Sequence, residues 1–191
     1  MDFIKLSQEL SESEERVGSS SIPTSLGTLR YVGDGYGRAA YVLDKWIIKL
    51  PFDDNGLCQS IEQHRIYEDA KDDYHFLLPV TFFCHVFSAE PHVATLGKSD
   101  EIETVFDWML IAGYSEDEVD ALEASVDHFI EKYDMLISDI KKADSWGIFE
   151  KRLVCYDYGM THKLYKQIHP DHVMSFTDDD LREIQRMIDF E

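Results

Sequence analysis

Basic residues are scarce in this sequence. Lysine and arginine together number 18 against 38 aspartates and glutamates, so the chain of 191 residues has a formal charge of -20. Proteins that bind nucleic-acid backbones neutralise phosphates with lysine and arginine, so the sequence predicts no direct nucleic-acid binding. Cysteine is also rare: the three cysteines lie far apart without a C-x-x-C pair. This predicts reduced thiols, no disulfide and no cysteine-based zinc site.

Long apolar runs are missing as well. The most apolar stretch, residues 76–87, is short and contains Pro79 and His85, whereas a membrane-spanning helix needs about 20 apolar residues. The N-terminus has acids and serines where a signal peptide has a basic start and an apolar centre. We therefore expect a cytoplasmic protein that does not enter the membrane. The hydrophobic fraction of 44% is enough for one core or a small two-lobed unit.

The chain divides by composition into three parts. Residues 1–25 are predicted to be a flexible lead-in, because their second half is rich in serine and glutamate and poor in apolar side chains. Residues 26–97 contain short β-type runs around a glycine-rich loop, which predicts a sheet lobe. Residues 98–191 are mainly helical in pattern. This order predicts an α+β fold, in which an N-terminal antiparallel sheet with one helix precedes a shortened helical lobe.

Helix signals support this division. A helix is predicted over residues 56–70, and its periodicity places Glu68 on the inward face. Capping boxes predict two later helices, one that begins after Asp100 and one that begins after Ser115. A last helix is predicted to begin at Thr177.

A glycine-rich loop joins two of the predicted strands. Gly33, Gly35 and Gly37 would let the backbone approach a phosphate where side chains would block it. Glycine is also common in ordinary hairpin turns, so both interpretations remain open for the loop taken alone. The chain has no GxxxxGK[ST] motif, which excludes a P-loop.

Lys49 lies in the nearly continuous apolar run WIIKL, which predicts a strand buried on both faces. A lysine in such a strand either pairs with a carboxylate or extends its amine to solvent. The predicted helix that follows offers Glu62 near its middle and Glu68 on its apolar side. In kinase-type sites a strand lysine held by a helix glutamate positions nucleotide phosphates.

Carboxylates recur in the second half of the chain. Asp157 follows the strand-like run RLVCY and precedes Gly159 by two residues, an arrangement that suits a magnesium ligand but also occurs in ordinary turns. Asp139 and Asp144 come earlier, five residues apart. The apolar period of the preceding helix continues through Ile140, so Asp139 is alternatively a solvated position on that helix.

The order and spacing of these features resemble the protein kinase superfamily. The segment GDGYG (33–37) resembles its glycine-rich loop, and WIIK (46–49) resembles the strand that carries its lysine. The segment YDYG (156–159) resembles its Asp-Phe-Gly motif, and DIKKAD (139–144) has the spacing of its catalytic loop. The resemblance extends from Leu26 to about Thr161 and implies a small, reduced, phage-like kinase or a pseudokinase.

The resemblance implies ATP and magnesium as cofactors. Gly33, Gly35 and Gly37 would cover the nucleotide phosphates. Lys49 would contact the phosphates while paired with Glu62 or Glu68. Asp139 would be the catalytic base, and Asp157 and Asp144 would bind magnesium.

Departures from the family leave two functions open. Ser138 precedes Asp139 where arginine is usual, Asp144 replaces an asparagine, and only 32 residues follow Gly159, too few for the peptide-docking part of a protein kinase. One hypothesis is an ATP-dependent phosphotransferase that acts on an unidentified protein or small molecule. The other is a non-catalytic acidic interaction protein, either a pseudokinase or a phage-type inhibitor of a basic or nucleic-acid-binding partner. The 14 acids and 4 bases of residues 98–144 favour a basic partner.

Overall fold

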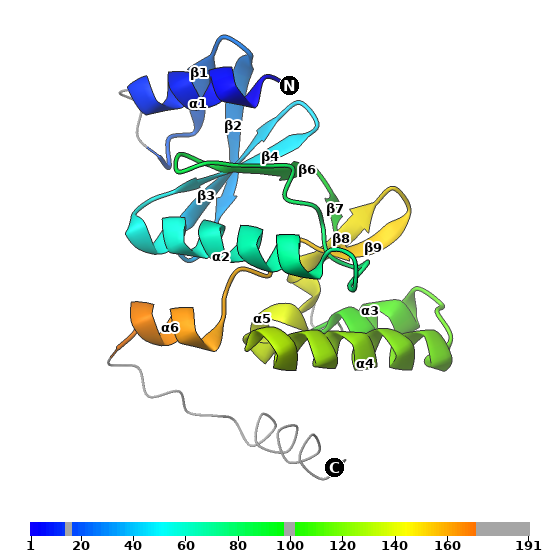
Figure 1. Cartoon of the computed structure of the whole chain (residues 1–191). Coiled ribbons are helices and arrows are strands. Elements are labelled where there is room, and N and C mark those ends of the chain that lie inside the picture. Colours follow the sequence, from blue (N-terminus) through cyan, green and yellow to red (C-terminus); the bar gives the residue numbers. More distant parts are fainter. Residues whose placement is uncertain (14–16, 98–101, 171–191) are drawn as a thin grey trace.

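The computed structural model describes residues 1–13, 17–97 and 102–170, in which a sheet-rich part lies against a helical part (Figure 1). Six strands form an antiparallel sheet in the order β1-β2-β3-β4-β6-β5. These strands are β1 (Ser21–Thr24), β2 (Gly27–Asp34), β3 (Arg38–Leu43), β4 (Trp46–Pro51), β5 (Phe82–Phe83) and β6 (Ser88–Pro91). A smaller sheet joins β7 (Ala94–Thr95), β8 (Trp146–Phe149) and β9 (Arg152–Cys155).

Four of the six helices in the described part of the chain lie within residues 102–170. The helices are α1 (Phe3–Glu12), α2 (Asp54–Ala70), α3 (Val105–Ile111), α4 (Glu116–Tyr133), α5 (Ile137–Ile140) and α6 (His162–Ile168), with a 3-10 turn, η1, at Ala143–Ser145. An antiparallel sheet that precedes mainly helical structure confirms the predicted α+β class.

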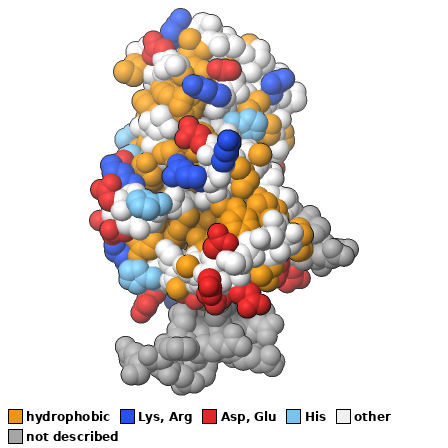
Figure 2. Space-filling view, turned by 90° about the vertical axis from the view of Figure 1, so that its right-hand side faces the viewer, with side chains coloured by type: hydrophobic (Ala, Val, Ile, Leu, Met, Phe, Trp, Pro, Cys, Tyr) orange, Lys and Arg blue, Asp and Glu red, His pale blue; other side chains and the backbone are white. Residues whose placement is uncertain are grey.

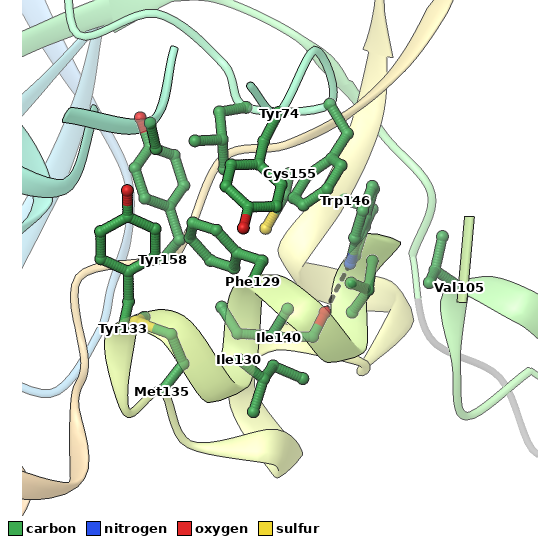
Figure 3. Packing of buried hydrophobic residues seen from close by; sticks show 14 of the residues in the cluster. Tyr74, Val105, Phe129, Ile130, Tyr133, Met135, Ile140, Trp146, Cys155 and Tyr158 are labelled. Carbon is green, nitrogen blue, oxygen red and sulfur yellow. Dashed lines mark hydrogen bonds between the residues drawn. The ribbon is translucent and has the colours of Figure 1, made fainter. Parts of the chain in front are cut away.

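Each part encloses its own hydrophobic core. In the sheet-rich part, Leu6, Tyr41 and Ile48 are fully buried in one cluster. In the helical part, aromatic side chains gather around Phe129 and Trp146, and the Trp146 indole Nε1 donates to the Ile140 carbonyl at 2.6 Å (Figure 3). Helix α2 lies between the sheet and the helices (Figure 1), and Ile66 in its second half belongs to the helical core.

The prediction of a flexible lead-in over residues 1–25 is wrong for most of that segment. Asp2 caps α1 by accepting a hydrogen bond from the Lys5 amide at 3.0 Å. Leu6 of α1 and Ile22 of β1 are buried in the sheet core. Helix α1 and strand β1 form because a few apolar residues at helical and strand spacing pack on the sheet, even though the composition of both elements is largely polar.

The helix predictions differ in outcome. Ser115 and Glu118 form the predicted capping box at the start of α4. The box predicted at Asp100 lies outside the described residues, and α3 begins later, at a box formed by Thr104 and Asp107. The helix predicted from Thr177 also lies outside the described residues.

Two further observations concern the predictions on nucleic-acid binding and on the membrane: the distribution of charge on the surface and the length of the helices. On the face in Figure 2, lysine and arginine side chains lie in small separate groups, with acidic side chains nearby. Within the described part of the chain, no helix combines the length and the hydrophobicity needed to cross a membrane.

Candidate functional site

A cleft of about 660 Å³ lies between the β2–β3 hairpin and the helical part. It brings together residues that the sequence spreads over more than a hundred positions. Among the lining residues are Gly33, Gly35, Tyr36, Arg38, Lys49, Asp139, Lys142, Asp144, Tyr156, Asp157 and His162. Six of the predicted site residues therefore share one cavity: Gly33, Gly35, Lys49, Asp139, Asp144 and Asp157.

The glycine loop forms one wall of the cleft. A Cβ atom added at Gly33 or Gly35 would meet no atom within 4 Å, so the backbone there faces open space. Gly37 is different, because a Cβ there would lie 2.8 Å from the Gly56 Cα atom at the start of α2. Gly37 therefore allows close packing of the hairpin on α2 and does not line the cleft.

The tip of the loop contacts the segment that follows α6. The Tyr36 hydroxyl lies 3.1 Å from His169 Nδ1, just past the end of α6, and the two rings meet edge to face at 4.7 Å between centroids. The hairpin is thus in contact with both α2 and the segment after α6.

Lys49 is buried on β4, and its partner is not one of the predicted helix glutamates. Its Nζ atom lies 2.9 Å from Glu90 Oε2 and donates to the Tyr156 carbonyl, also at 2.9 Å. Glu90 lies on β6, which pairs directly with β4. The predicted pairing with Glu62 or Glu68 is wrong: Glu62 pairs with Arg65 and Glu68 with Lys71, all on α2 itself or at its end.

The orientation of α2 explains this correction. The helix buries Gln59, Gln63, Ile66 and Ala70 and leaves Glu68 exposed. Gln63 lies on the buried face of α2, and its Nε2 donates to Glu90 Oε1 at 2.8 Å. The negative charge that holds Lys49 therefore comes from the sheet, and the helix contributes an amide that binds the same carboxylate.

Gln63 also connects this pair to Asp157. Arg38, almost fully buried, donates from Nη1 to Gln63 Oε1 at 2.7 Å, and its Nη2 lies 3.3 Å from Asp157 Oδ1. One continuous polar network thus runs from Asp157 through Arg38, Gln63 and Glu90 to Lys49.

Two aspartates of the opposite wall, Asp139 and Asp144, contact a second cation. Lys142 Nζ lies 3.4 Å from Asp139 Oδ1 and 3.9 Å from Asp144 Oδ1. Burial raises the pKa of the Asp139 carboxyl, the charges of Asp157 and Asp144 raise it further, and Lys142 only partly opposes them. Asp139 does not continue the surface of α4, because α4 ends at Tyr133 and Asp134 adopts a left-handed conformation with φ of 52°.

The segment around Asp157 is tightly anchored. The buried Tyr158 hydroxyl donates to the Leu78 carbonyl at 2.7 Å. A Cβ atom at Gly159 would lie only 2.8 Å from the Gln59 carbonyl oxygen of α2, so a larger residue would displace the segment. The Asp-x-Gly sequence is therefore a close contact between this segment and α2.

Comparison with known proteins adds no assignment. No family model and no curated protein matches the chain. The observed α+β arrangement is compatible with the predicted kinase resemblance without distinguishing it from other folds of that class.

Sequence analysis overlooks four residues of the site: Arg38, Gln63, Glu90 and Lys142. Arg38 directly follows the glycine loop, and Glu90 is an isolated acid within a buried strand. A charged side chain that is buried in a strand needs a partner of opposite charge or a hydrogen bond. Both residues could therefore have been predicted from the sequence as candidates for a buried polar contact. Gln63 and Lys142 carry none, since glutamine in a helix and lysine beside acids are usual surface patterns.

The predicted magnesium ligands are present but already paired. Asp157 contacts Arg38 and Asp144 contacts Lys142. Within residues 1–13, 17–97 and 102–170, no group of three or more histidines, cysteines and carboxylates is placed to hold one metal ion. Magnesium therefore stays a prediction.

Proposed function

We propose that the cleft binds a nucleoside triphosphate, with ATP as the nucleotide that the kinase resemblance implies. The observation that supports this is the convergence of Gly33, Gly35, Lys49 and Asp157 on one cavity. The cavity volume is in the range usual for small-molecule sites. In this proposal the fold is a reduced kinase-like fold, with the cleft between its sheet lobe and its shortened helical lobe.

The glycine loop and Lys49 would hold the phosphates. The backbone at Gly33 and Gly35 is open to the cleft, so its amide groups can approach phosphate oxygens without a side chain in the way. Lys49 is kept in place by Glu90 and by the Tyr156 carbonyl. A fixed ammonium beside an open backbone is a favourable arrangement for a polyphosphate.

Phosphate transfer would require more than binding. Asp139 is the carboxylate proposed to accept a proton from a substrate hydroxyl. It faces the cleft, and its raised pKa would make it a stronger base than an ordinary aspartate. The substrate would be a protein or a small molecule that reaches Asp139 from the open side of the cleft.

Calorimetric titration with ATP tests the binding proposal. The wild type should bind ATP, and Gly35→Val should bind it at least tenfold more weakly, because the added side chain starts at an open position of the cleft wall, where a Cβ atom meets nothing within 4 Å. Lys49→Met should weaken binding as well. Lys5→Met is the matched control. It removes the same charge from an exposed position of α1, and it should bind ATP like the wild type.

A basic partner is the second candidate. The first turns of α4 present Glu116, Asp117 and Asp120 to solvent. Lack of ATP binding by wild type at millimolar concentration would contradict the nucleotide proposal and favour this alternative. Neutralising these three acids, while leaving the capping Glu118 intact, should then weaken the complex with a basic protein and reduce its salt dependence.

A further inference from the structure

Arg38 is a fixed positive charge at the edge of the cleft. The side chain is almost fully buried, and its guanidinium is held by the amide oxygen of Gln63, itself 1% exposed. Its other nitrogen lies 3.3 Å from Asp157 Oδ1. An arginine keeps its charge at every accessible pH, and burial with a buried hydrogen-bond partner prevents it from moving away.

Lys142 is a second positive charge that lines the same cleft. It lies 3.4 Å from Asp139 and 3.9 Å from Asp144. Asp157 likewise contacts Arg38. The three carboxylates of the cleft are therefore already in contact with two basic side chains.

A magnesium ion would have to compete with both cations. Bound to Asp157, it would lie within a few ångströms of a guanidinium that cannot leave, and like charges repel strongly in a partly buried site. Magnesium also requires nearly octahedral oxygen coordination. In nucleotide sites it is usually held by one or two carboxylates together with phosphates and water, and here Asp157 and Asp144 each already contact a basic side chain.

We infer that Arg38 and Lys142 take the place of a divalent cation, so that the cleft binds its triphosphate without magnesium. This inference rests on the proposed nucleotide binding. Guanidinium and ammonium groups both bind phosphate oxygens well, and both side chains line the cleft. Arg38 thereby weakens the affinity of this carboxylate for a metal ion: while its guanidinium is paired with Asp157 Oδ1, it repels a cation at the same side chain.

Calorimetric titrations with ATP in EDTA and in magnesium chloride test the inference. The wild type should have dissociation constants within threefold of each other in the two buffers. In EDTA, Lys142→Met and Arg38→Met should each bind ATP at least tenfold more weakly. Magnesium should restore part of the affinity of Arg38→Met, because Asp157 is then released. Lys166→Met, an exposed lysine of α6, controls for the change in net charge.

The possible outcomes separate this inference from the proposed function. Binding that EDTA abolishes would overturn the inference and leave nucleotide binding intact, whereas no binding in either buffer would overturn both. If Arg38→Met does not fold, Lys142→Met decides alone, since its side chain is partly exposed. A nucleotide-free test uses manganese: paramagnetic broadening of the Asp157 and Asp144 amide signals in the wild type at micromolar manganese would also contradict the inference.

Discussion

At the scale of single residues, the site depends on the buried pair of Lys49 and Glu90. The side chain of Lys49 is 10% exposed and that of Glu90 1%. Removing one partner of a buried ion pair leaves the other charge uncompensated, at a cost of about 3 to 5 kcal/mol. Glu90→Gln should therefore lower the free energy of unfolding by about that amount, measured by urea denaturation.

Glu62→Gln and Glu68→Gln are the controls for this prediction. Both side chains pair with neighbours on the surface of α2, and exposed pairs contribute about 0 to 1 kcal/mol. Each substitution should change stability by no more than that. Equal losses in all three variants would mean that Glu90 is not the partner of Lys49.

The pKa of Asp139 provides a second prediction at this scale. Burial and the neighbouring aspartates raise it, and Lys142 opposes them. The folded protein therefore binds this proton more tightly than the unfolded chain, so its contribution to stability falls as pH rises from the unfolded pKa through the folded one. Carbon-13 NMR should give a raised pKa in the wild type and a still higher one in Lys142→Met. An ordinary pKa that the variant does not alter would show that Asp139 is solvated.

The sequence predicted the burial of the strand that carries Lys49, but it did not identify the residue that pairs with this lysine. An apolar run with one lysine is local information, and it was sufficient to infer burial. The identity of Glu90 depends on β6 pairing with β4 and on α2 turning Gln63 inward. Both features depend on contacts between distant parts of the chain. The buried face of α2 includes polar side chains, so the 3.6-residue periodicity of apolar residues does not reveal which face of the helix is buried.

At the scale of elements, the hairpin and α2 meet at two glycines. A Cβ atom at Gly56 would lie 1.8 Å from the Gly37 carbonyl oxygen, and the Phe52 amide donates to that same oxygen at 2.8 Å. Gly56→Ala should therefore separate the hairpin from α2 and destabilise the protein by about 1 to 3 kcal/mol, the usual cost of overpacking. Thermal unfolding measures it.

Gly35→Ala is the matched control. An added methyl group there meets nothing within 4 Å, so the stability should change by no more than about 0.5 kcal/mol, as for most surface positions. A loss in Gly35→Ala as large as that in Gly56→Ala would contradict the assignment of Gly37 and Gly56 to packing.

Elements defined by local signals were predicted best. The Ser115 capping box and the hairpin around the glycine loop depend on neighbouring residues, and both are present. Helix α1 and strand β1 were missed because their few apolar residues, Leu6 and Ile22 among them, are stabilised by the sheet that they cover. Composition alone could not reveal that surface.

At the scale of the whole molecule, the cleft exists because distant segments are fixed to one another. Arg38 of β3, Gln63 of α2 and Asp157 after β9 are joined by hydrogen bonds. The sequence indicated which residues could act together through their order and spacing. Their convergence on one cavity follows only from the three-dimensional packing of the sheet against α2 and the helices.

Mapping ATP onto the protein by NMR tests this account most directly. In a titration monitored through backbone amide signals, ATP should perturb Gly33, Gly35 and Asp139 together, because all three line the cleft. The exposed residues Asp117 and Asp120 of α4 should stay unchanged. Perturbation of α4 without the cleft, or no perturbation at millimolar ATP, would contradict the claim that this cleft is a nucleotide site.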